Sequence, residues 1–141
     1  EQWVGKWAFR EVIEEELIQY ARIDLCIVGG LTEALKIAHW CEAHYIDIVP
    51  HNPWGPISAA VCAALCMSCT NVGVLEMPEI PGNLDSDIFP VQLQWERGYV
   101  IPQDMPGLGV DIDMDIAEKY RAVPNSWHPH LVRNDGSLTN W

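Results

Sequence analysis

Apolar positions along the chain follow two alternating patterns. Helical spacing, with apolar side chains on one face and polar ones opposite, occurs over residues 7–21, 32–44 and 56–69. Short apolar runs, typical of buried strands, occupy residues 23–28, 45–49 and 72–76. Gly29-Gly30 ends the first run, Thr32 is the expected cap of the second helix, and Pro56 suits the first position of the third. This order predicts an α/β fold with parallel strands and crossover helices.

The pattern changes after Glu76. Residues 77–90 are rich in proline and acidic residues and predict an irregular loop. Residues 91–95 and 98–101, joined by Glu96-Arg97, predict a hairpin. A short helix is expected over 113–120, with Ile116, Ala117 and Tyr120 buried, followed by an irregular tail. We therefore divide the chain into strand–helix units, residues 1–88, and a closing segment, residues 89–141.

Three parallel strands make a poor domain by themselves, because such sheets need both faces covered and more neighbours. The chain also opens on Glu1 rather than methionine. We expect it to be a segment of a larger fold, and to aggregate when expressed alone because the sheet edges would be unpaired.

Charge and composition limit the classes of partner that the chain can bind. The chain has 20 acidic and 8 basic side chains, for a net charge of −12, so it has little with which to neutralise phosphates. This argues against nucleic-acid and anionic-membrane partners. The longest apolar stretch, residues 57–67, is too short to span a bilayer. Five cysteines without a visible leader predict free thiols in the cytoplasm.

Ionisable side chains lie at corresponding places along the three predicted strands. Asp24 lies at or near the end of the first, His51 just past the second, and Glu76 at the end of the third. The carboxyl ends of parallel strands meet at one edge of a sheet, where α/β barrels place their active sites. There, Asp24 would accept the imidazole N–H of His51 and fix its tautomer, which favours a general acid.

Longer motifs surround these residues. Asp24 precedes Gly-Gly-Leu-Thr-Glu at 29–33, Pro-His-Asn-Pro-Trp-Gly-Pro-Ile fills 50–57, and the three ionisable residues are 27 and 25 positions apart. Together with Lys-Ile-Ala at 36–38, these motifs resemble the final strand–helix units of the mandelate racemase/muconate lactonizing enzyme branch of the enolase superfamily. The acid-sugar dehydratases, such as galactonate and gluconate dehydratases, are the most similar. Residues 106–111 and 135–141 resemble that family's closing segment.

The resemblance implies the C-terminal part of a (β/α) barrel, incomplete on its own, whose closing segment packs on a capping domain. It implies a Mg²⁺ cofactor, with Glu1, six residues before the Trp-Ala-Phe at 7–9, as one metal ligand. The implied reaction is α-proton abstraction from a sugar acid, then elimination of the 3-hydroxyl to give a 2-keto-3-deoxy acid. His51 would be the general acid and Asp24 its partner, with Glu76, Trp54 and Pro53 binding substrate.

Alternatives remain open at this point. In an epimerase, racemase or cycloisomerase of the same superfamily, His51 would act as a base on the opposite face of the substrate. A non-catalytic, structural member is a further possibility. The base and the other metal ligands would lie upstream of residue 1, so we expect the rest of the enzyme chain, a sugar acid and other copies of the enzyme as partners.

Overall fold

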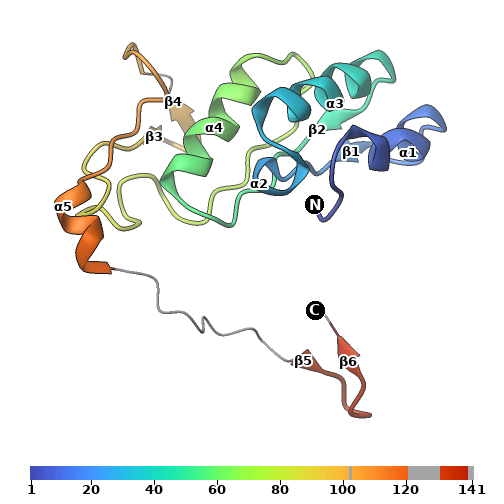
Figure 1. The fold of residues 1–141 in the computed structure, drawn as a ribbon. Coiled ribbons are helices and arrows are strands. Elements are labelled where there is room, and N and C mark those ends of the chain that lie inside the picture. The colour runs from blue at the N-terminus through green and yellow to red at the C-terminus, as the bar shows by residue number, and fades with distance from the viewer. Residues whose placement is uncertain (102, 121–130, 140–141) are drawn as a thin grey trace.

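A computed structural model describes residues 1–101, 103–120 and 131–139 (Figure 1). The elements are η1 (Lys6–Phe9), α1 (Arg10–Glu14), β1 (Tyr20–Ala21), α2 (Leu25–Val28), α3 (Leu31–Ala43), β2 (Asp47–Ile48), α4 (Pro56–Met67), β3 (Gln94–Glu96), β4 (Tyr99–Ile101), α5 (Met114–Ala117), η2 (Glu118–Tyr120), β5 (Leu131–Val132) and β6 (Leu138–Thr139). Across the described ranges, no helix combines the length and the apolar content that crossing a membrane requires. Residues 102, 121–130, 140 and 141 of the predicted closing segment lie outside the described residues.

The predicted parallel arrangement is confirmed, in strands shorter than expected. β1 pairs in parallel with β2, Tyr20 opposite Asp47 and Ala21 opposite Ile48. The third segment is represented by a parallel bridge between Ile48 and Val72, and the Gly73 N–H donates to the Ile48 carbonyl at 2.9 Å. The three segments therefore run side by side and end at one edge.

One contiguous core lies between these segments and the helices. Its buried side chains come from every element between η1 and α4, and they include Phe9, Ile13, Ile23, Ile37, Ile48 and Leu65. Burial of this apolar surface is the main favourable contribution to folding. It fixes the backbone at the strand ends from which the polar residues project.

The first predicted helix was too long. It ends at Glu14, and Glu16 adopts a positive φ of 52° that breaks the helical path. Leu17 and Tyr20, assigned by spacing to the buried face, are 57% and 61% exposed. No glycine or proline marks this break, so the apolar spacing alone suggested a continuous helix.

The predicted strand over 23–28 was also wrong in part. The strand precedes it as β1, and Leu25–Val28 form the short helix α2. Asp24 causes the change, because its side chain accepts hydrogen bonds from the Cys26 and Ile27 N–H groups and so caps the helix.

The two longer helices agree with the prediction. α3 buries Ala34, Ile37, Ala38 and Cys41, although Gly30, at φ 85°, takes the N-cap position expected of Thr32. α4 begins at Pro56 as predicted and ends two residues before Cys69.

The closing segment holds the predicted hairpin. β3 and β4 pair antiparallel around a turn at Arg97 and Gly98, whose φ values of 51° and 88° suit a tight two-residue turn. α5 is shorter than predicted and buries no residue, and Tyr120 is 63% exposed, with its hydroxyl donating to Asp87. The hairpin of β5 and β6 was not predicted, because the tail was interpreted as irregular. The division at residue 88 stays a prediction.

Candidate active site

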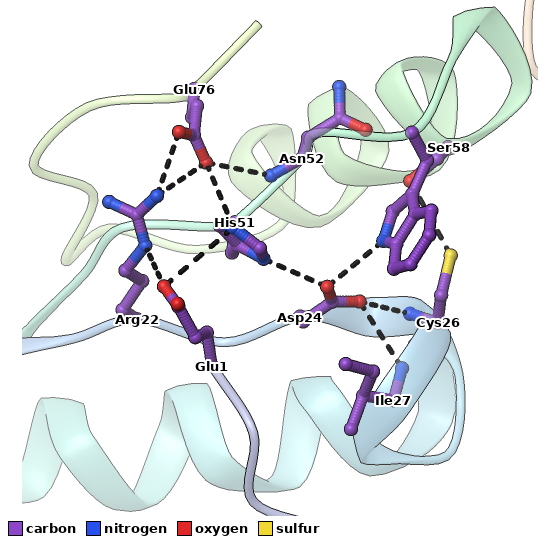
Figure 2. A network of polar contacts seen from close by, with 10 residues as sticks. Glu1, Arg22, Asp24, Cys26, Ile27, His51, Asn52, Ser58 and Glu76 are labelled. Carbon is purple, nitrogen blue, oxygen red and sulfur yellow. Dashed lines mark hydrogen bonds and ion pairs between the residues drawn. The ribbon is translucent and has the colours of Figure 1, made fainter. Parts of the chain in front are cut away.

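Asp24 lies at the centre of a polar cluster at the strand ends (Figure 2). Its side chain is fully buried, and both oxygens are used. Oδ1 accepts from the N–H groups of Cys26 and Ile27 at 2.8 and 3.2 Å. Oδ2 lies 2.8 Å from His51 Nδ1 and accepts from Trp54 Nε1 at 2.9 Å. Four contacts therefore fix one buried carboxylate.

His51 projects from the end of the β2 segment. A parallel backbone bridge links it to Asp24, and its N–H donates to the Ile23 carbonyl at 2.8 Å. Because an ionised carboxylate only accepts, Nδ1 carries the proton toward Asp24. Nε2 then faces Glu1 Oε2 and Glu76 Oε2, each at 3.7 Å. The predicted Asp–His pair is present, with the outer nitrogen directed toward two carboxylates.

Glu76 ends the third segment and reaches the same edge. Its Oε2 accepts from the Asn52 backbone N–H at 3.1 Å. Arg22 Nη2 contacts both of its oxygens, at 2.7 and 2.8 Å. The predicted meeting of Asp24, His51 and Glu76 at one edge is therefore what the structure shows.

Glu1 joins the cluster from the N-terminal segment. Its Oε2 is 2.7 Å from Arg22 Nε. The segment is held further along, where the Lys6 N–H and Nζ donate to Glu33 Oε1 at 3.0 and 3.1 Å. The Lys6 backbone N–H, followed by the Lys36 and Lys6 ammonium groups, lowers the pKa of Glu33 to about 2. Glu33 thus anchors the segment that delivers Glu1.

Arg22 is the residue that sequence reasoning missed. It follows β1 directly, between buried Ala21 and Ile23, and its guanidinium contacts Glu1 and Glu76. Arg22 lies between two apolar residues, and this alternation was a usable signal, because neighbouring side chains of an extended segment point to opposite faces. Its partners are far apart in sequence and could not be predicted from local pattern.

Unlike Glu76, the other two predicted substrate-binding residues have exposed side chains. Trp54 is 54% exposed, and its indole N–H donates to Asp24 Oδ2, the oxygen that also faces His51. Pro53 is exposed, and its side chain has no polar atom with which to join the network. Substrate contacts by Trp54 and Pro53 stay predictions.

Comparison with known proteins identifies the family. Residues 1–116 match the model of the enolase C-terminal domain-like family. The chain belongs to this family. A D-mannonate dehydratase from Caulobacter vibrioides is 34% identical over 96% of the chain, and a D-galactonate dehydratase from Ralstonia nicotianae is 32% identical over all of it. The chain spans 34% and 39% of the length of these two relatives.

Solved structures agree with this assignment. An enolase from Pantoea ananatis with bound D-gluconate and Mg is 30% identical, with a TM-score of 0.73 over 81% of this chain and 28% of that one. A mandelate racemase/muconate lactonizing enzyme from Jannaschia sp. is 28% identical, with a TM-score of 0.80 over 89% of this chain and 32% of that one. Two predictions are therefore confirmed. The chain belongs to the enolase superfamily, and it forms part of the barrel domain.

Proposed function

We propose that this chain is part of a Mg²⁺-dependent dehydratase that converts a sugar acid to a 2-keto-3-deoxy acid. The observation that carries the proposal is the pairing of buried Asp24 with His51 at 2.8 Å, in a chain similar to sugar-acid dehydratases. We include a cytoplasmic location, which the five free cysteines support.

His51 acts as the general acid. Asp24 holds Nδ1–H, so that the proton available for transfer is the one on Nε2 of the imidazolium. After a base outside this chain removes the α-proton, Nε2 gives its proton to the departing 3-hydroxyl. The C3–O bond breaks, water leaves, and the resulting enol tautomerises to the 2-keto acid. General acid catalysis of this kind is worth roughly 10²–10⁴ in rate.

Glu76 binds the substrate. Its ionised carboxylate accepts hydrogen bonds, which suits the hydroxyl groups of a sugar acid. The Asn52 N–H and Arg22 hold it in place, so a substrate hydroxyl meets an oriented acceptor.

Glu1 can serve as one ligand of a Mg²⁺ ion. Mg²⁺ prefers oxygen donors and is commonly held by one or two carboxylates together with water and substrate. Glu1 offers such a carboxylate at the cluster, whereas the residues the structure describes contain no group of three or more His, Cys, Asp or Glu able to hold a metal. When bound, Mg²⁺ supplies Lewis-acid stabilisation of the negative charge that develops as the α-proton leaves.

The direct test uses the full-length enzyme that carries this chain. It is incubated with Mg²⁺ and a panel of aldonates, and 2-keto-3-deoxy acids are measured. Absence of product from every aldonate would refute the dehydratase proposal. Inversion at C2 without loss of water would favour the epimerase alternative.

His51→Asn should lower the rate of dehydration by about 10²–10⁴-fold, since the general acid is lost. Exchange of the substrate α-proton with deuterated solvent, followed by NMR, should continue because the base is a different residue. His39→Asn, an exposed histidine on α3, is the matched control and should dehydrate like the parent. Loss of α-proton exchange in His51→Asn would instead make His51 a base.

A further inference from the structure

We infer that Arg22 is a positioning residue, whose guanidinium spans Glu1 and Glu76 and fixes these two carboxylates relative to His51. The inference rests on the proposed function, which gives the two carboxylates their roles. It adds a residue that the sequence motifs did not single out.

The geometry of the contacts is that of a planar fork. Nε meets Glu1 Oε2 at 2.7 Å, and Nη2 meets Glu76 Oε1 and Oε2 at 2.7 and 2.8 Å (Figure 2). Nε and Nη2 lie on one edge of the guanidinium, so a single rigid plane sets the separation of the two carboxylates. A lysine ammonium is a point charge on a flexible stem and cannot reproduce this constraint.

The charges at this edge favour a cation that contacts both carboxylates. Oε2 of Glu1 and Oε2 of Glu76 both lie 3.7 Å from His51 Nε2, so two negative groups converge on one atom. Like charges this close repel each other and separate unless a cation holds them. Among the described residues, Arg22 is the one Lys or Arg side chain that forms an ion pair with either carboxylate.

Fold stability explains these contacts poorly. The Arg22 side chain is 43% exposed, so solvent screens its ion pairs and reduces their contribution to the stability of the fold. The neighbouring buried residues Ala21 and Ile23 supply the packing at this point of the chain. Arg22 therefore acts mainly on the placement of the two carboxylates.

A backbone reporter makes this placement measurable. The Asn52 N–H donates to Glu76 Oε2, so its hydrogen exchange reports whether that carboxylate stays in place. Pro50 and Pro53 have no amide hydrogen, so a peptide covering 50–55 contains few exchanging amides, and the Asn52 signal is resolvable.

The experiment compares Arg22→Gln and Arg22→Lys in the full-length enzyme with Arg10→Gln, which removes an exposed arginine paired with Glu14 on α1. Three quantities are measured: amide exchange in 50–55, Mg²⁺ affinity by calorimetry with the metal alone, and kcat and KM on an aldonate that the parent dehydrates. Arg22→Gln should exchange Asn52 faster and lose about 10²-fold in kcat, the cost of a small misplacement. Its Mg²⁺ affinity should change little, because the loss of a positive charge near the metal offsets the loss of the constraint on Glu1.

Arg22→Lys should restore the charge but only part of kcat, and Arg10→Gln should match the parent. Unchanged kcat and Asn52 exchange in Arg22→Gln would overturn the inference, as would full recovery with lysine. A parallel fall in melting temperature, Mg²⁺ affinity and kcat would also overturn it, since that indicates a structural role. If the parent dehydrates no aldonate, the proposed function fails, while exchange and Mg²⁺ affinity still decide the inference about Arg22.

Discussion

Replacement of Asp24 by Asn separates the two tasks of this carboxylate. Asparagine is as good an N-cap as aspartate, so its amide oxygen can keep the bonds from the Cys26 and Ile27 N–H groups that begin α2. Its NH₂ group then faces His51 Nδ1 and the Trp54 N–H, where Asp24 presented an acceptor. The substitution therefore keeps the acceptor that caps α2 but replaces the acceptor that faces the imidazole with a donor.

The expected loss of stability follows from the two bonds on Oδ2. Hydrogen bonds to a charged acceptor contribute about 1.5–3 kcal/mol each. The Trp54 bond is lost, while the His51 contact survives as a neutral bond once the imidazole changes tautomer. We expect the free energy of unfolding to fall by about 2–4 kcal/mol. The NH₂ group also opposes Nδ1–H of the imidazolium, so dehydration should slow by about 10²–10⁴-fold.

Urea unfolding and the keto-acid assay on the full-length enzyme measure the two effects. Trp54→Phe is the matched variant, because it removes the same tryptophan bond and keeps the carboxylate next to His51. It should lose about 1.5–3 kcal/mol of stability and less than about tenfold in kcat. An Asp24→Asn enzyme that loses stability but keeps kcat within about threefold would refute the reasoning, since Asp24 would then be only a helix cap.

Two further predictions concern groups outside the catalytic cluster. The pKa of Glu33, about 2, is depressed in the folded chain, so its carboxylate stabilises the fold above its unfolded pKa of about 4.5, and this contribution disappears as the pH falls toward 2. Glu33→Gln should therefore flatten this part of the acid limb in urea titrations, and identical limbs would contradict the expectation. Burial raises the pKa of the Cys41 and Cys62 thiols to about 12, so both should react with Ellman's reagent at about pH 8 only on unfolding, whereas exposed Cys26 reacts at once. Immediate labelling of Cys41 or Cys62 in the folded enzyme, located by peptide mapping, would show that these thiols are open to solvent and would contradict the expectation.

The sequence pattern predicted the repeating strand–helix units of the fold. The apolar runs predicted three parallel segments, although the first strand, β1, precedes the predicted run, and Asp24 and His51 proved to be in contact at the ends of neighbouring segments. The pattern works here because strand ends in a parallel sheet share an edge, so the position of a residue along its strand also indicates its position in space.

The failures have separate causes. Four apolar residues, Leu25–Val28, fit a strand or a helix equally well, and the side chain of Asp24 decides between them by capping. Tyr120 was expected in a core, but it lies in η2, which buries no residue, and is 63% exposed. Arg22 was missed because its meaning depends on Glu76, 54 residues away.

The edge that carries the polar cluster is separated from the core that supports it. Ile23 and Ile48 are fully buried within the segments, whereas His51 and Glu76 lie at their ends and are followed by exposed residues such as Pro53 and Pro78. Sequence drift in those connections can reshape what the edge recognises without opening a cavity below it. A lineage built on this plan can change its substrate by small steps while its folding remains protected from them.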